Sequence, residues 1–283
     1  MTEMLVKNYM TKDVVTVEIP SARDDVLRIL KRTGISGVPV VKAKTKELLG
    51  IVTRKDLLHM PEENQVAILM SENPVVIGPK ATLAEAAEVM KEKHIRRLPV
   101  VEGKKLTGII SVSDIVGAVA KLNDSREIRD GFIGKKTFAA WEETPLCVVG
   151  KMMELAHVEA MPILNSDNKL TGIISERDLI RSSKIEDDVR TSDFSTGTDD
   201  DEWTWESIRD THTLTFGISK VELPARPVKD FMIRKVIAVP DNAEIADCAL
   251  KMKRGRVDQL PVIDKDGRLA GMLFDRDVIK ALL

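Results

Sequence analysis

The chain has 283 residues and a formal net charge of −2, and 43% of its residues are hydrophobic and 31% charged. This length fits two domains or one repeated unit, and the composition excludes global disorder. No apolar run approaches the ~20 residues of a membrane span, and the start lacks the apolar segment of a secretory signal. We therefore expect a cytoplasmic protein without a membrane partner. Cys147 and Cys248 are the only cysteines, which excludes a disulfide framework and a cysteine-based zinc site.

Acidic residues gather between positions 186 and 206, where nine acids stand against one base. That segment carries −8, which leaves +6 on the remainder of the chain. A mildly basic body suits a small anionic ligand, but it is far from the basic surface of a dedicated nucleic-acid binder. We therefore do not expect nucleic acid to be the main partner.

One pattern of elements recurs four times along the chain. It begins with a β-rich stretch, clearest at 14–17, 75–77 and 236–239, and continues with an amphipathic helix. A strand around a proline follows, then a polar turn, a second strand near a glycine, and a second helix near an aspartate. The anchors are Pro39, Pro99, Pro162 and Pro261, then Gly50, Gly108, Gly172 and Gly271, then Asp56, Asp114, Asp178 and Asp277. Each glycine stands six residues before its aspartate, so the sequence predicts four β-α-β-β-α units.

This fourfold pattern resembles the CBS (cystathionine-β-synthase) domain, and the resemblance covers most of the chain. The copies are expected at 6–60, 67–122, 133–184 and 228–283, with a connector at 185–227. In that family two copies pair through their sheets into a Bateman module with two ligand clefts. The resemblance therefore implies an α/β (α+β) fold of two modules, a layout similar to the γ subunits of AMP-activated protein kinase and their prokaryotic look-alikes. The sequence leaves open whether the modules associate within one chain or as a homodimer.

Three copies carry a Ser/Thr-x-x-Asp sequence where the second strand gives way to a helix. The pairs are Thr53 with Asp56, Ser111 with Asp114, and Ser175 with Asp178. One interpretation is a capping box, in which hydroxyl and carboxylate satisfy free backbone N–H groups. The other is a ligand site, because the free N–H groups and partial positive charge of a helix start attract phosphate. In copy four Phe274 replaces the hydroxyl, which argues against phosphate binding there although Asp277 remains.

The resemblance implies a role for each of these residues. In the family the aspartate contacts a ribose, the hydroxyl lies near a phosphate, and adenine occupies an apolar slot. The slot walls would be Val15 and Ile35 in copy one, Val76 and Ile95 in copy two, and Ile237 and Val257 in copy four. Copy three has an irregular start without such walls, so we expect the first module to bind best.

Basic residues provide further candidate contacts to phosphate. Arg96 and Arg97 precede Pro99 and resemble the phosphate-binding stretch of the kinase γ subunits. Two adjacent arginines can bind a phosphate through paired hydrogen bonds, although they are equally typical of a solvated helix end. In the other copies the candidates stand directly before the aspartate. They are Lys55, Arg177 and Arg276.

No catalytic pattern accompanies the repeats. The sequence has no Walker A loop, no G-x-S-x-G elbow, no dinucleotide fingerprint and no metal-binding histidine spacing. His94 and His157 both stand five residues before their prolines, where a helix end is favoured over a ligand contact. We therefore expect a non-enzyme that requires no cofactor and binds AMP or ADP, with ATP as the weaker choice, as a regulatory ligand.

Two alternatives stay open. S-adenosylmethionine or methylthioadenosine would offer the same adenine and ribose, but a sulfonium ligand would make no use of the two arginines. The other alternative is a structural or regulatory interaction protein with partly empty clefts, including one that contacts nucleic acid. The irregular third and fourth copies and the +6 body favour it.

The connector carries two of the three tryptophans. Its residues 185–200 are predicted to form a loop, 203–209 a short helix, and 213–223 a strand. Trp203 and Trp205 either anchor the connector or form an aromatic, acidic contact surface for an unidentified protein target.

Overall fold

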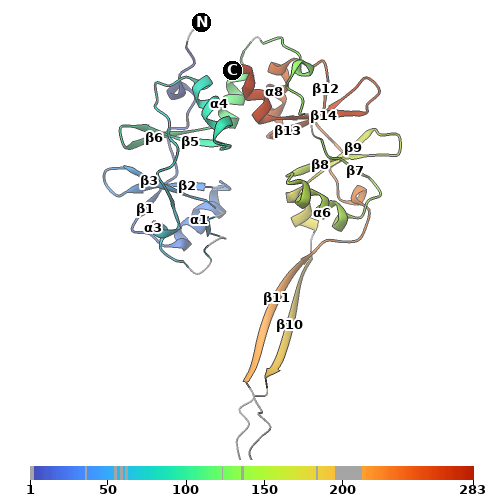
Figure 1. The fold of residues 1–283 in the computed structure, drawn as a ribbon, viewed down its shortest axis with the longest axis horizontal. Coiled ribbons are helices and arrows are strands. Elements are labelled where there is room, and N and C mark those ends of the chain that lie inside the picture. Colours follow the sequence, from blue (N-terminus) through green and yellow to red (C-terminus); the bar gives the residue numbers. More distant parts are fainter. Residues whose placement is uncertain are drawn as a thin grey trace, which may run out of the picture. The chain divides into compact units, whose positions relative to one another are not determined.

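The structure is a computed structural model that describes residues 3–283 except 36, 54–55, 58–59, 61–62, 123, 135–136, 183 and 195–211 (Figure 1). It divides into two compact units. Unit 1 comprises Met1–Lys136, Ile237–Asp264 and Ala270–Leu283, and unit 2 comprises Thr137–Val236 and Lys265–Leu269. Unit 1 thus holds copies one and two with most of copy four, and unit 2 holds copy three with the connector.

The first two copies each pack helical residues against a small sheet. Copy one contains β1 (Val17–Ile19), α1 (Arg23–Thr33), β2 (Gly37–Lys42) and β3 (Leu48–Thr53). Copy two contains α4 (Leu83–Glu92), β5 (Arg97–Glu102), β6 (Lys105–Ser111) and α5 (Val112–Val119). Between them lie α3 (Val66–Leu69) and β4 (Ser71–Glu72), and a short 3₁₀ helix, η1 (Val6–Asn8), precedes copy one.

The last two copies repeat this order. Copy three contains β7 (Ala140–Trp141), α6 (Leu146–Ala156), β8 (Ala160–Leu164), β9 (Leu170–Ser175) and α7 (Glu176–Ser182). Copy four contains β12 (Val239–Pro240), α8 (Ile245–Gly255), β13 (Gln259–Ile263), β14 (Leu269–Phe274), α9 (Asp275–Val278) and η4 (Ile279–Leu282). They are preceded by η2 (Ile128–Asp130) and η3 (Val228–Asp230). The predicted α/β fold of four β-α-β-β-α repeats is confirmed.

The four copies share one strand register. The first strand residue pairs in parallel with a residue 23 positions further on in every copy. These pairs are Val17 with Val40, Ile77 with Val100, Ala140 with Ile163, and Val239 with Val262. The second of these residues pairs in turn with the repeat glycine, as in Val40 with Gly50 and Val100 with Gly108. The register therefore defines equivalent positions across the repeats.

The segment before each copy packs on a neighbouring copy rather than on its own. Val6 donates its N–H to Ala81 in copy two, and Val66 donates to Ser21 in copy one. The same exchange recurs further along the chain. Ile128 donates to Ala243 in copy four, and Val228 donates to Thr144 in copy three. All four donors have fully buried side chains, so each exchanged segment completes the core of the copy that it contacts.

The repeat glycines lie under these exchanged segments. A Cβ on Gly50 would lie 2.7 Å from the carbonyl oxygen of Ser71, and one on Gly108 would lie 2.5 Å from Sδ of Met10. Real side chains do not approach so closely, so these positions accommodate only glycine without a shift of the segment above.

The connector differs in part from the prediction. Residues 212–222 form strand β11 (His212–Glu222), in line with the predicted strand, but β10 (Lys184–Phe194) replaces the first part of the predicted loop. The two pair antiparallel along their whole length, as Figure 1 shows. An acidic composition disfavours a strand in isolation, whereas a partner strand rich in β-branched residues supplies a ladder for it. Residues 195–200 and the predicted helix with Trp203 and Trp205 lie outside the described residues.

Among the described residues, no helix is both long and apolar enough to cross a membrane. Cys248 is fully buried in the core, and burial raises the pKa of its thiol to about 11. The thiol therefore behaves as a small apolar core residue, as its place on the helix stripe predicts.

Candidate functional site

The predicted capping boxes are present where the second strand of each copy meets its second helix. The Thr53 hydroxyl donates to Oδ2 of Asp56 at 2.6 Å, and the Ser111 hydroxyl donates to Oδ2 of Asp114 at the same distance. The backbone N–H of each hydroxyl residue donates to the same oxygen, at 2.8 and 2.9 Å. Ser175 and Asp178 repeat the arrangement in copy three. One carboxylate oxygen in each of these copies is thus committed to the cap.

The second carboxylate oxygen distinguishes the copies. In copy three Arg181 donates to Oδ1 of Asp178 at 2.9 Å, and in copy four Lys280 donates to Oδ1 of Asp277 at 2.6 Å. These two aspartates are only 4% and 8% exposed. Asp114 is half-buried, and in the described part of the chain its Oδ1 has no hydrogen-bond partner.

The sequence explains this difference. The cation in copies three and four stands three residues after the aspartate, on the same helix face. In copy two that position is Gly117, which has no side chain to donate. Copy two therefore presents a free carboxylate acceptor beside a helix start. The corresponding position in copy one, His59, lies outside the described residues.

The shared register shows which residues are equivalent to the predicted first walls of the slot. The apolar residue two positions before the buried first-strand residue is 38–48% exposed in all four copies. These residues are Val15, Val75, Phe138 and Ile237. The prediction named Val76, which is also exposed, but Val75 is the equivalent of Val15 and Ile237. Phe138 holds the equivalent position in copy three, which lacks a β-branched run, and all four residues stand 24 positions before their prolines.

The opposite wall was predicted at the residue four positions before the proline in copies one, two and four. These residues, Ile35, Ile95 and Val257, are half-buried. In copy four, Cδ1 of Ile237 and a methyl of Val257 lie 2.5 and 3.5 Å from the position that a Cβ on Gly255 would take. The two predicted walls of copy four therefore border the same point.

A left-handed residue precedes this wall in every copy. Its φ is +72° at Gly34, +53° at His94 and His157, and +52° at Arg256. His157 ends helix α6 in this conformation. The two histidines thus lie at helix ends, as the sequence favours. Among the described residues, no group of three potential ligands could hold a metal ion.

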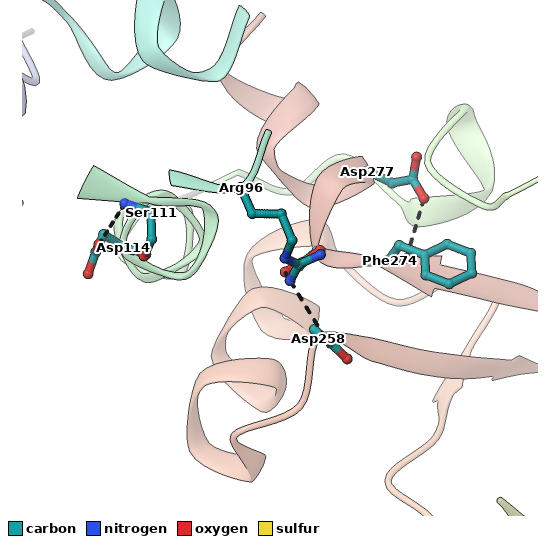
Figure 2. A network of polar contacts seen from close by, with 7 residues as sticks. Arg96, Ser111, Asp114, Asp258, Phe274 and Asp277 are labelled. Atoms are coloured by element: carbon teal, nitrogen blue, oxygen red, sulfur yellow. Dashed lines mark hydrogen bonds and ion pairs between the residues drawn. The ribbon is translucent and has the colours of Figure 1, made fainter. Parts of the chain in front are cut away.

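The two arginines of copy two lie in different surroundings. Arg97 opens β5 and pairs in register with Ser111, so it is the basic residue directly across the strand pair from the start of α5. Arg96 instead reaches copy four, as Figure 2 shows. Its guanidinium donates to both carboxylate oxygens of Asp275, at 3.3 and 2.5 Å, and lies 3.6 Å from Asp258. In this structure its charge is thus engaged by carboxylates.

The other basic residues predicted to contact a phosphate are Arg276, Arg177 and Lys55. Arg276 stacks over the ring of Phe274, with 5.7 Å between the guanidinium carbon and the ring centroid. Arg177 is exposed, and Lys55 lies outside the described residues. A surface hollow of about 740 Å³ follows helix α1 and includes none of the predicted contacts. It is lined by Asp25, Arg28, Ile29, Lys31 and Arg32.

Comparison with known proteins yields the same repeats. The sequence model of the CBS domain matches residues 6–63, 65–121, 131–184 and 228–283. A crystal structure of an uncharacterized conserved protein from Pyrococcus horikoshii is 29% identical and superposes with a TM-score of 0.70, covering 99% of this chain and all of that one. Protein MJ1225 of Methanocaldococcus jannaschii, described as a proposed archaeal homologue of g-AMPK, shares the fold with a TM-score of 0.65 at 21% identity over 99% of this chain and 100% of its own.

Enzymes also match over part of their length. The inosine-5'-monophosphate dehydrogenase of Korarchaeum cryptofilum is 32% identical over 112 residues, which are 38% of this chain and 23% of the enzyme. The corresponding enzyme of Staphylococcus haemolyticus is 25% identical over 252 residues, or 88% of this chain and 48% of the enzyme. This chain therefore spans less than half of these relatives.

Proposed function

We propose that this chain, which belongs to the CBS domain family, is a non-catalytic regulatory protein that binds an adenine nucleotide, AMP or ADP in preference to ATP. The observation that carries the proposal is the free Oδ1 of Asp114 beside the start of helix α5. A carboxylate oxygen held in place by a capping box can accept hydrogen bonds from the two hydroxyls of a ribose. Its partner oxygen is fixed by Ser111, so the acceptor is positioned before a ligand arrives.

Neighbouring groups suit the other parts of a nucleotide. The start of α5 offers backbone N–H groups and a partial positive charge to a phosphate, and Arg97 stands across from Ser111 to add a full charge. The exposed Val75 and the half-buried Ile95 offer apolar surface for the adenine ring. A short phosphate chain suits this limited set of donors.

The proposal ranks the copies. Asp178 and Asp277 are buried and each carries a cation on its second oxygen, so a ribose would have to displace an ion pair. We therefore assign the first site to copy two, with copy one beside it, and expect weaker binding or none at the aspartates of copies three and four. Binding would regulate an unidentified target only if that target prefers one of the bound and free conformations.

A thermal-shift series tests the proposal with Asp114→Asn. An asparagine keeps an oxygen for the cap but replaces the outward acceptor with an NH₂ donor, so it removes the ribose contact while preserving the helix start. AMP at ~100 times its Kd should stabilise the wild-type protein by about 2.7 kcal/mol. The Asp114→Asn variant should lose this shift, whereas the matched Asp178→Asn control should keep it.

The same series includes ADP, ATP, S-adenosylmethionine and methylthioadenosine. Arg96 donates to Asp275, so it could bind a phosphate only if that ion pair opened. The two sulfur nucleosides carry no phosphate, and they are therefore the informative comparison. A shift with these alone would keep the site and replace the ligand. No shift with any of the five would reject the site and return the aspartates to a purely helix-capping role.

A further inference from the structure

Copies two and four share one helical interface within unit 1. The buried residues of both belong to a single hydrophobic core, which includes Ile115 and Val116 of α5 together with Cys248 of α8 and Val278 of α9. Copies one and three each have a core of their own. The contact between copies two and four therefore has an apolar centre that is continuous with the core of both copies.

The apolar part of this interface does not specify a partner. Counting from Asp114 and Asp277, Ile115 is equivalent to Val278, and Val116 to Ile279; all are buried and apolar. Two surfaces so alike could each pair with themselves in a second chain, because a twofold pair needs only a self-complementary face. Something other than hydrophobic burial must select the copy two–copy four pair.

The charged residues at this interface differ between copy two and copy four. Arg96 stands three residues before Pro99, and Asp258 stands three residues before Pro261, so the two occupy the same repeat position. Their side chains face each other at 3.6 Å (Figure 2). The Arg96 guanidinium also binds Asp275. The position equivalent to Asp275 in copy two is Val112, which is apolar. Copy two thus contributes a base, and copy four contributes two acids.

We propose that Arg96, Asp258 and Asp275 select the partner at this interface, so that the helical face of copy two accepts copy four and rejects a second copy two. If copy two of one chain paired with copy two of another chain, Arg96 would face Arg96 with no carboxylate between them. If copy four of one chain paired with copy four of another, four carboxylates would come together without the Arg96 guanidinium that engages them here. Like charges at an otherwise complementary surface reject a wrong partner more effectively than they strengthen the right one.

Burial makes this charge set sensitive to mispairing. Asp275 is only 5% exposed, and its burial raises the pKa of its carboxyl while the charge of Arg96 lowers it. Without Arg96 the carboxylate would be left in an apolar surrounding with Asp258 as its charged neighbour. Losing Arg96 would therefore leave the buried Asp275 carboxylate without its cation, whereas the Arg96 and Asp258 side chains are each 47% exposed and stay in contact with water.

A charge-exchange experiment tests the proposal with two full-length chains. The first carries Arg96→Asp, and the second carries Asp258→Arg with Asp275→Asn. In each chain alone, copies two and four have like charges, so hydrogen-exchange protection of α5 and α8 should fall. When the chains are mixed, every pairing between them is between opposite charges, and sedimentation should detect a 1:1 heterodimer with protection restored. Lys93→Asp, the same charge change at an exposed position of copy two, is the matched control and should behave as wild type.

Wild-type protection of α5 and α8 in the Arg96→Asp chain would overturn the proposal, and so would two folded chains that fail to form the heterodimer. Protection of α6 in unit 2 reports whether each chain is folded. If Arg96→Asp does not fold, a double-mutant cycle between Arg96→Gln and Asp258→Asn replaces it. Non-additive shifts in the urea midpoint would support the proposal, and additive shifts would reject it.

Discussion

The position five residues before each repeat proline is occupied by three residue types. Gly34, His94, His157 and Arg256 all adopt the left-handed conformation that ends a helix. Glycine enters this region freely, whereas a residue with a Cβ pays about 1–2 kcal/mol there. Three of the four copies therefore carry a strained helix end.

Replacing His157 by glycine should stabilise the protein. The substitution relieves the strain at φ +53° but adds freedom to the unfolded chain, so we expect a net gain of about 0.5–1 kcal/mol. Urea denaturation measures it. The reverse change, Gly34→His, should lose a similar amount, because the space around Gly34 is open and only its φ of +72° opposes a side chain. A stability loss in His157→Gly would instead point to a contact made by the imidazole.

At the scale of elements, the exchanged segments explain the repeat glycines. The chain turns from one copy to the next, and each segment crosses the second strand of a neighbouring copy at its glycine. At Gly50 the nearest atom above is a backbone oxygen, which has no freedom to rotate away. The exchanged segment can therefore lie this close only because residue 50 is a glycine. Since the segment joins copies one and two, their pairing depends on this glycine as well.

Gly50→Ala should destabilise copy one by about 1–3 kcal/mol, the usual range for an overpacked site. The added Cβ would lie 2.7 Å from the carbonyl oxygen of Ser71 and 2.8 Å from Sδ of Met70, so β4 must shift. Gly78→Ala is the matched control, because open space surrounds that Cβ position. Equal urea midpoints for the two variants would show that β4 yields freely and that the close approach does not matter.

The sequence predicted the elements better than the contacts between them. Hydrophobic periodicity and fixed intervals depend on local order, so the β-α-β-β-α repeats and the capping boxes could be recognised from single copies. The exchange of segments joins residues of different copies, and the engagement of Arg96 by Asp275 joins residues 179 positions apart, so no local pattern encodes either contact. The predicted wall was Val76, whereas the strand register makes Val75 the equivalent of Val15; both are apolar, so composition alone does not separate them.

At the scale of the whole chain, the distribution of cores sets which parts unfold together. Copies two and four share a core, whereas copy three has its own in unit 2. Local openings follow cooperative units of packing rather than units of sequence. Copies two and four, far apart in the chain, should therefore lose their structure together.

Ile115→Ala tests this coupling. Ile115 is fully buried in the shared core, and its truncation should cost about 2–5 kcal/mol. Native-state hydrogen exchange should show the loss in α5 and α8 alike, although α8 carries no substitution, and should leave α6 unchanged. Met153→Ala, a truncation of similar kind in the core of copy three, should show the converse, with faster exchange in α6 and none of the effect in α5 or α8. If Ile115→Ala weakened α5 alone, copies two and four would be separate folding units joined by a surface, and the charges between them would have to hold the contact without a common core.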